Sequence, residues 1–180
     1  MNFTHDDLCY LAGFVDREGC FFIGLFNTKS AATGNINQNY HTLLKISNNN
    51  YEVLQWIQQR FGGSIDKRNK KQKLRENEFI TYSLEYSGNA LTTLSKLLLP
   101  HLKVKKRHAE VMIKMRETFP TKRGKAFVSE ETKLYRYTLM QELRSLNTRF
   151  HGHHLKVRLD LLPCRPSATQ QGVPCQSERV

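Results

Sequence analysis

The feature that most constrains the fold is the junction between a helix and a strand in the stretch LAGFVDREGCFF. Apolar residues recur at helical spacing from Leu8 to Val15, and Gly19 ends that pattern. The run CFFIGLFN, which follows, is rich in aromatic and β-branched residues and predicts a strand. Two acids, Asp16 and Glu18, stand at this junction, although the chain has a formal net charge of +12. The end of a helix explains the glycine but does not explain why two acids stand there.

Patterns further along the chain predict a second set of strands and more helices. Alternating or β-branched runs predict strands at 20–27, 40–47, 64–71 and 78–86, and helical periodicity appears at 51–61, 89–102, 105–119 and 133–146. Residues 31–39 have the composition of a loop. The order is αββαββα with further helices, which predicts an α+β fold with one four-stranded antiparallel sheet covered by helices on one face. We expect one domain over 1–150 and a flexible or loosely docked tail over 151–180.

An antiparallel sheet of this kind leaves its second face free for solvent or a ligand. If Phe21 and Ile23 face the helices, alternation assigns the free face to Cys20, Phe22, Gly24, Phe26, Thr28, Asn39, His41, Leu43, Lys45, Ser64, Asp66, Arg68, Thr81, Ser83 and Glu85. Such a mixture of polar groups suits the reading of base edges in a major groove. The alternative is that these side chains are polar only because a solvated sheet face is polar.

The charge balance favours a polyanionic partner. The chain has 28 Lys and Arg against 16 Asp and Glu, which indicates nucleic acid, with an anionic membrane surface as the alternative. One basic cluster, DKRNKKQKLR, contains Lys70 and Lys71 and lies between two predicted strands. The other, KVKKR, places Lys103, Lys105 and Lys106 at a helix start, where phosphate oxygens are favourable partners.

Other classes of protein are disfavoured by the sequence. No apolar run approaches the roughly 20 residues that span a bilayer. The N-terminus lacks the features of a signal or transit peptide, so we expect the protein to work in the compartment where it is made.

The four cysteines form no CxxC pair, and Cys9 lies on the apolar side of its helix, where a buried thiol is expected. A zinc site in the tail is the alternative for the remaining ligand-type residues, although their spacing fits no known zinc pattern: His151, His153, His154, Cys164 and Cys175.

The first helix suggests a reason for the two acids. Cys9, Ala12 and Gly13 have small side chains that would let another backbone approach, most simply the same helix of a second copy across a two-fold axis. Two helix C-termini would then lie together, each negative by its dipole. Divalent cations would neutralise the crowded carboxylates, and oxygen ligands favour Mg²⁺, as in a phosphodiesterase. The alternative is an acidic helix end with a paired Asp.

The stretch LAGFVDREG, together with the downstream LLPHLKVKKRHA, resembles the signature of the LAGLIDADG homing endonucleases. The resemblance covers roughly Leu8 to Met115, with weaker support to Leu146. It implies that Glu18 binds the catalytic metal, with the backbone carbonyl of Arg17 as a further ligand. It also implies that Asp16, at the helix interface, is mainly structural.

The resemblance assigns two more residues to the reaction. Lys105 best matches the family's active-site lysine, and Asn48 matches a polar residue after the second strand that orders solvent. Arg17 departs from the small residue that is usual between the two acids, and its side chain could contact a phosphate or perturb metal binding.

One signature copy is present, which in this family implies a homodimer on a long, near-palindromic DNA site. The resemblance implies a double-strand break across the minor groove with short 3′ overhangs. It also implies dependence on Mg²⁺, replaceable by Mn²⁺, with Ca²⁺ supporting binding alone. The alternative function is a non-catalytic nucleic-acid binder, such as a maturase for a group I intron RNA.

Overall fold

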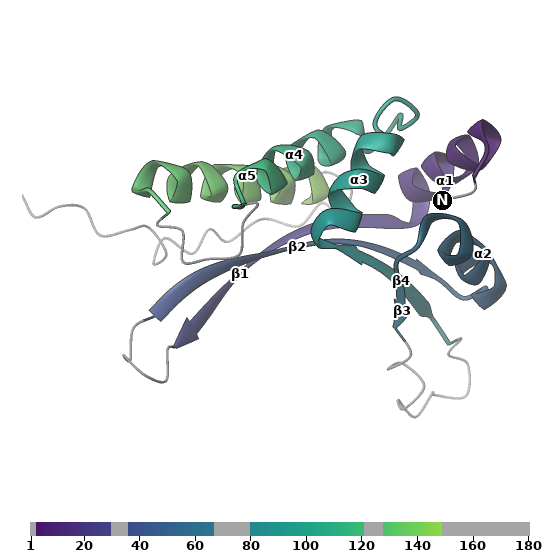
Figure 1. Ribbon diagram of the computed structural model, residues 1–180, viewed down its shortest axis with the longest axis horizontal. Coiled ribbons are helices and arrows are strands. Elements are labelled where there is room, and N and C mark those ends of the chain that lie inside the picture. Colours follow the sequence, from purple (N-terminus) through teal and green to yellow (C-terminus); the bar gives the residue numbers. More distant parts are fainter. Residues whose placement is uncertain (1–2, 30–35, 67–79, 121–127, 149–180) are drawn as a thin grey trace, which may run out of the picture.

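The structure is a computed structural model that describes residues 3–29, 36–66, 80–120 and 128–148. The predicted order of elements is confirmed: α1 (His5–Glu18), β1 (Gly19–Lys29), β2 (Ile36–Asn48), α2 (Tyr51–Phe61), β3 (Ser64–Asp66), β4 (Tyr82–Ser87), α3 (Gly88–Leu98), α4 (Lys106–Glu117) and α5 (Glu130–Thr148) (Figure 1). The chain therefore has the α+β plan that its sequence patterns predict.

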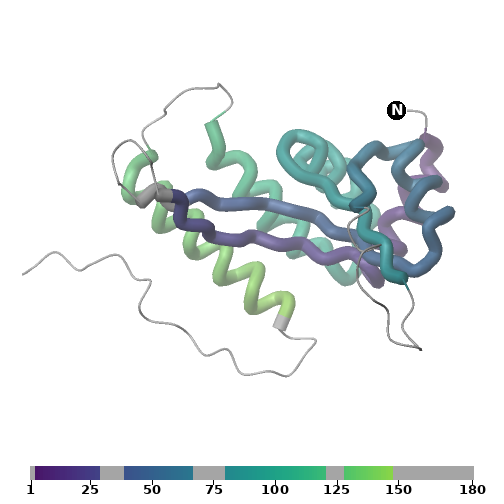
Figure 2. Tube along the Cα trace, turned by 90° about the horizontal axis from the view of Figure 1, so that it is seen from below, coloured from purple at the N-terminus to yellow at the C-terminus, as the bar shows by residue number. Residues whose placement is uncertain are grey.

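The four strands form one antiparallel sheet in the order β1-β2-β4-β3. The helices lie above the curved sheet in Figure 1, and in Figure 2, seen from below, β1 and β2 pass in front of the green helices. The lower face of the sheet carries no helix among the described residues. This is the open face, and its residues alternate with those of the core.

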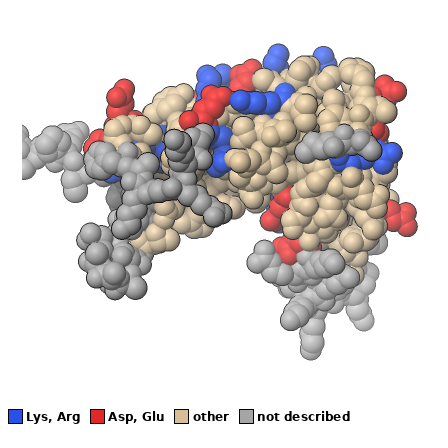
Figure 3. Space-filling model, in the orientation of Figure 1, with Lys and Arg blue, Asp and Glu red and all other residues tan. Residues whose placement is uncertain are grey.

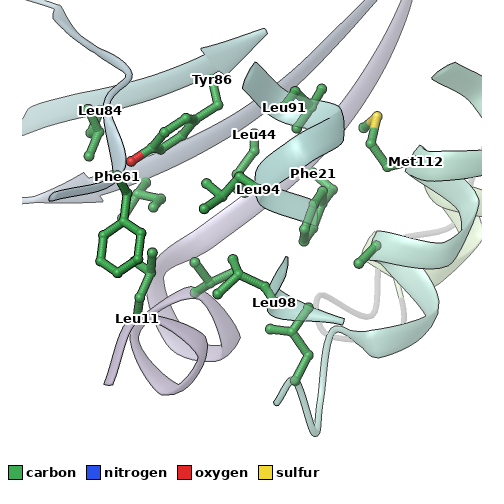
Figure 4. Packing of buried hydrophobic residues seen from close by; sticks show 14 of the residues in the cluster. Leu11, Phe21, Leu44, Phe61, Leu84, Tyr86, Leu91, Leu94, Leu98 and Met112 are labelled. Carbon is green, nitrogen blue, oxygen red and sulfur yellow. The ribbon is translucent and has the colours of Figure 1, made fainter. Parts of the chain in front are cut away.

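The core fills the space between the sheet and the helices (Figure 4). Phe21, Leu44 and Leu84 point from three strands towards the helices and are fully buried. Leu11 from α1 and Leu98 from α3 complete the same cluster. Each such side chain contributes about 1.5–3 kcal/mol when it leaves water, so the register that buries these residues is strongly preferred.

Local sequence signals fix both ends of α1. Thr4 and Asp7 form a reciprocal capping box, in which each side chain accepts the other residue's backbone N–H. At the C-terminal end, a Cβ on Gly19 would lie 2.7 Å from the carbonyl oxygen of Val15. Only glycine therefore lets β1 begin directly after the last residue of the helix.

Several predicted boundaries are wrong. The strand expected over 78–86 begins at Tyr82, and the helix expected over 89–102 ends at Leu98. Residues 36–39 were expected in a loop, but β2 begins at Ile36 because the ladder with β1 continues to the pair Lys29 and Ile36. The last helix also begins three residues earlier than its periodicity predicts. Residues 67–79, which include the basic hairpin with Arg68, Lys70 and Lys71, lie outside the described residues, as does the tail. A search of the described helices finds none with the length and apolarity needed to cross a membrane.

Candidate functional site

Glu18 is the last residue of α1, and Gly19 starts the first strand of the sheet. The Glu18 side chain is 34% exposed, so its carboxylate reaches solvent. Its described partner is Arg17, whose Nε lies 3.1 Å from Oε1 of Glu18. Because the Arg17 side chain is 87% exposed, this ion pair is screened by water and leaves the carboxylate available to another cation.

Asp16 ties α1 to the loop before α4. One carboxylate oxygen accepts the backbone N–H groups of Lys103 and Val104, at 2.8 and 3.1 Å, and the other accepts that of Lys105 at 2.8 Å. These amides stand just ahead of the first residue of α4, where N–H groups lack partners within the helix. Asp16 therefore has a structural role inside one chain.

Lys105 occupies the C-terminal end of α1. Its ammonium nitrogen donates to the backbone carbonyl oxygens of Val15, Asp16 and Arg17, at 3.1, 2.9 and 3.4 Å. A cation is favourable there because the free carbonyls and the helix dipole are negative. Burial lowers the pKa of Lys105, and nearby negative charges, chiefly Asp16, oppose that shift without cancelling it. The sequence thus brings Lys105 and Glu18, 87 residues apart, to the same helix end.

The predicted alternation of the sheet is confirmed. Phe21, Ile23, Leu44, Ile46 and Leu84 are buried against the helices, so the open face carries Cys20, Phe22, Gly24, Phe26, Thr28, Asn39, His41, Leu43, Lys45, Ser64, Asp66, Ser83 and Glu85. Thr81 was expected on this face but lies outside the sheet, because β4 begins at Tyr82. A row across the sheet runs from Cys20 through Lys45 and Glu85 to Ser64, and it begins two residues after Glu18.

Two residues of the open face are covered by their neighbours. Ser83 is 1% exposed, and its hydroxyl lies 3.3 Å from that of Ser47, so it cannot reach a partner outside the chain in this arrangement. Gly24 is buried because the rings of Phe22 and Phe26 close over it, within 3 Å of where a Cβ would stand. Alternation alone could not reveal this covering, which depends on the rotamers of the two rings.

Polar contacts organise the outer part of the open face. The Asn39 amide donates to the Thr28 hydroxyl at 2.7 Å. The ring of Phe26 meets the ring of His41 edge to face, with centroids 6.1 Å apart. Phe22 and Phe26 remain 42% and 51% exposed. The open face is therefore a mixture of exposed aromatic rings and hydrogen-bonding groups.

Asn48 does not lie beside Glu18 on the open face. It pairs with Tyr82 and alternates onto the same side as buried Ile46, and its side-chain oxygen accepts the backbone N–H of Asn50 at 2.8 Å. Asn48 is the last residue of β2, and its side chain caps the turn that leads into α2. On the open face Lys45 pairs with Cys20, and the next open-face residue of β2, Ser47, is the polar residue that the register brings nearest to Glu18.

Of the three small residues expected on the outer side of α1, Cys9 and Gly13 lie there and Ala12 does not. Cys9 and Gly13 are exposed, and a Cβ on Gly13 would meet nothing within 4 Å. Ala12, by contrast, is 1% exposed and packs in the core of its own chain. The expectation of a buried Cys9 is wrong, because its side chain points away from the core. Tyr10, 50% exposed, joins Cys9 and Gly13 on the exposed side.

Basic side chains lie over the helix layer and around the loop before α4. In Figure 3 the Lys and Arg side chains visible on this face gather over the helix layer. Lys103 and Lys106 are exposed on either side of Lys105, so cations surround the loop that Asp16 holds.

A cavity of about 510 Å³ lies between α1 and α2, lined by residues such as Asp6 and Trp56, at the opposite end of α1 from Glu18.

Comparison with known proteins places the chain among characterised folds. A family model described as LAGLIDADG endonuclease matches residues 11–107, which include the α1 junction and the loop before α4. No curated protein matches the sequence.

Three solved structures share the fold. The homing endonuclease I-CvuI in complex with its target has a TM-score of 0.60 and 20% identity, covering 79% of this chain and 83% of that chain. The archaeal intron-encoded homing endonuclease I-Vdi141I, complexed with DNA, has a TM-score of 0.61 and 20% identity, covering 78% and 84%. The LAGLIDADG homing endonuclease I-LtrWI, bound to target DNA, has a TM-score of 0.55 and 15% identity, and the match covers 79% of this chain but 45% of that one.

Proposed function

The chain belongs to the LAGLIDADG endonuclease family, and we propose that it is a homing endonuclease that hydrolyses both strands of DNA at one long, near-palindromic site. The observation that carries this proposal is the end of α1. The Glu18 carboxylate is open to solvent there, and the Lys105 ammonium is fixed on the carbonyls of the same turn. An acid and a cation held at one helix end suit hydrolysis of a phosphodiester.

The donor atoms at this helix end fit a divalent cation of the Mg²⁺ type. The Glu18 carboxylate and the Arg17 carbonyl are hard oxygen donors, which Mg²⁺ prefers together with water and phosphate oxygens. When bound, Mg²⁺ would lower the pKa of the attacking water and stabilise the leaving oxygen. Mn²⁺ should replace it, and Ca²⁺ should support binding without cleavage. Glu18 would be the principal ligand from each chain.

Lys105 would act on the phosphate. Its aliphatic stem is half-buried and its ammonium is anchored on three carbonyls, so its position is fixed before DNA arrives. A preorganised cation stabilises the charge that builds on the phosphoryl oxygens, because it needs no rearrangement during the reaction. Its exposed neighbours Lys103 and Lys106 would hold the backbone phosphates on either side.

The open face of the sheet would lie in the major groove and read base edges. Asn39 and His41 offer the donors and acceptors that suit purines, and the exposed rings of Phe22 and Phe26 suit the methyl group of thymine. Arg68, Lys70 and Lys71, from the basic hairpin, are proposed to extend this surface with base and phosphate contacts. Contacts to phosphate would give most of the affinity, and the sheet would give the specificity.

Two copies of the chain would form the active enzyme. One copy covers 45% of I-LtrWI, so two copies amount to a molecule of that size. Figures 1 and 2 both show α1 at one end of the domain, with Cys9 and Gly13 exposed along it. Pairing α1 with its symmetry mate would bring the two Glu18 carboxylates close to each other and so to adjacent phosphates of the two strands.

The proposed pairing of α1 with its symmetry mate can be tested by measuring the molecular mass of the protein in solution. Gly13→Leu should convert a dimer to a monomer in sedimentation experiments, because a branched side chain would stand where two backbones meet. Gly62→Ala is a poor control because Gly62 has a φ of 74°, so the exposed Glu52→Gln serves instead. A dimer of unchanged stability in Gly13→Leu would rule out this interface.

The proposed activity is tested by selection. Purified protein is incubated with a randomised DNA library in Mg²⁺, and the cut molecules are sequenced. We expect one long, near-palindromic site with short 3′ overhangs. Tight binding of nucleic acid without any cut product would instead identify a non-catalytic binder, such as an intron RNA maturase.

A further inference from the structure

A second group of metal-ligating side chains lies at the other end of α1 from Glu18. His5 and Cys9 are one helical turn apart, and His101 joins them from the turn that follows α3. We propose that these three residues bind a zinc ion, with water in the fourth position. This site is separate from the proposed catalytic centre at Glu18, and Cys9 lies on the exposed side of α1 that is proposed to pair with a second copy.

The separations of the donor atoms suit tetrahedral zinc. The Cys9 sulfur lies 3.5 Å from Nε2 of His5 and 3.7 Å from Nδ1 of His101. Zinc binds sulfur at about 2.3 Å and imidazole nitrogen at about 2.0–2.1 Å, so tetrahedral angles place the two kinds of donor about 3.6 Å apart. One donor atom from each residue lies within 4.8 Å of the others, so a small movement of the rings would bring all three donors to bonding distance of one metal ion.

The backbone that carries the three ligands is fixed. The capping box of Thr4 and Asp7 sets the first turn of α1, where His5 stands. The backbone N–H of His101 donates to the Leu98 carbonyl at 2.9 Å, and the next residue, Leu102, is buried in the core. Asp16 then holds residues 103–105 against the same helix. The site therefore needs no ordering of a loop when the metal binds.

The chemistry of the donors selects a different metal from that at Glu18. Thiolate and imidazole favour Zn²⁺ and related transition metals, whereas Mg²⁺ prefers carboxylate and water oxygens. In the single chain His5 and Cys9 are exposed and His101 is partly exposed, so an ion can enter before two copies pair. Three protein ligands leave one position for water, as in other open zinc sites.

The probe is Co²⁺, which reports sulfur and nitrogen ligation by its absorption, followed by competition with Zn²⁺. The full-length chain, reduced and freed of metal by a chelator, is titrated without Mg²⁺ and without DNA. We expect one equivalent of tetrahedral Co²⁺ per chain with a sulfur-to-metal charge-transfer band, displaced by Zn²⁺. Zn²⁺ should also raise the melting temperature, since it binds the folded state.

Variants assign the signal to its residues. Cys9→Ser should remove the charge-transfer band and weaken Zn²⁺ binding roughly 100-fold. His5→Gln, at an exposed position in the first turn, should weaken it similarly while keeping the fold. Cys20→Ser is the matched control, because Cys20 is the other exposed free thiol among the described residues. It should bind as the wild type does.

A second control concerns the tail. The double variant C164S/C175S should retain the site, since neither thiol belongs to it. The proposal is overturned if wild-type protein binds no Co²⁺, or if Cys9→Ser binds it unchanged. It is also overturned if the tail variant alone loses the band. None of these measurements involves cleavage, so they leave the proposed function to be judged separately.

Discussion

Asp16 and Lys105 hold each other through both backbone and side chain. The Asp16 carboxylate accepts the Lys105 backbone N–H at 2.8 Å, and the Lys105 ammonium donates to the Asp16 backbone carbonyl at 2.9 Å. The first contact fixes the start of α4, and the second places a cation at the end of α1. Glu18 follows Asp16 by two positions, and the exposed Lys103 and Lys106 lie on either side of Lys105 in the sequence. This reciprocal pair explains why an acid stands at the junction in a basic chain.

Asp16→Asn should lower the free energy of unfolding by about 2 kcal/mol, measured with urea. The amide cannot replace both carboxylate oxygens, so at least one of three N–H groups loses a charged acceptor. Asp6→Asn is the matched control, because Asp6 is exposed in the first turn of the same helix and should cost less than about 1 kcal/mol. Equal losses in the two variants would contradict the structural role of Asp16.

Lys105→Met should slow cleavage roughly 100-fold or more, with the modest loss of affinity expected of one phosphate contact. The methionine keeps the buried stem and removes the ammonium from the end of α1. Single-turnover rates at saturating protein separate the two effects. Lys106→Met, next in sequence and exposed, should instead weaken binding and reduce the salt slope by about 0.9 at an unchanged rate. A slower rate in Lys106→Met with weaker binding alone in Lys105→Met would mean that Lys106, and not Lys105, acts in the reaction.

Tyr86→Phe should raise the free energy of unfolding by about 1 kcal/mol. The Tyr86 hydroxyl is buried in the core and has no hydrogen-bond partner among the described residues. Burial raises the pKa of this hydroxyl, so it stays neutral and its desolvation is uncompensated. Calorimetry or urea unfolding would measure the gain. A loss of stability would mean that the hydroxyl has a partner, such as a water molecule, in solution.

His108 should make the fold less stable in mild acid. Burial lowers the pKa of His108 from its usual 6.5, and the charge of Lys105 lowers it further. The unfolded chain therefore binds a proton at higher pH than the folded chain does. The stability from neutral His108 is complete above about pH 6.5 and falls as the pH drops below it. His108→Leu should reduce this loss between pH 7.5 and 5, and the same slope in wild type and His108→Leu would contradict this assignment.

Much of the fold could be predicted from periodicity. The apolar spacing of α1 and the alternation of β1 and β4 decide which side faces the core, and the structure buries those residues. The start of β2 was missed because Asn37 and Gln38 have low strand propensity, and their pairing with β1 is a tertiary effect. Propensity within one segment cannot show where a ladder between two segments ends.

The candidate site divides in the same way. Glu18 and Lys105 could be found because each stands in a recognisable motif. Asn48 was expected after the second strand, but β2 continues through Asn48, and alternation then puts its side chain on the same side as Ile46. The cluster of His5, Cys9 and His101 joins residues 92 positions apart in the chain, and no spacing in the sequence reveals it. Contacts of that range require the packed structure.

The most direct test of the central claim is the cleavage rate of Glu18→Gln on the selected DNA site in Mg²⁺, measured beside its affinity for that site in Ca²⁺. The amide occupies the same space at the end of α1 but is a poor metal ligand. Glu18 as the principal metal ligand predicts an uncut substrate and an affinity close to that of the wild type. Cleavage by Glu18→Gln at nearly the wild-type rate would show that the metal is bound elsewhere.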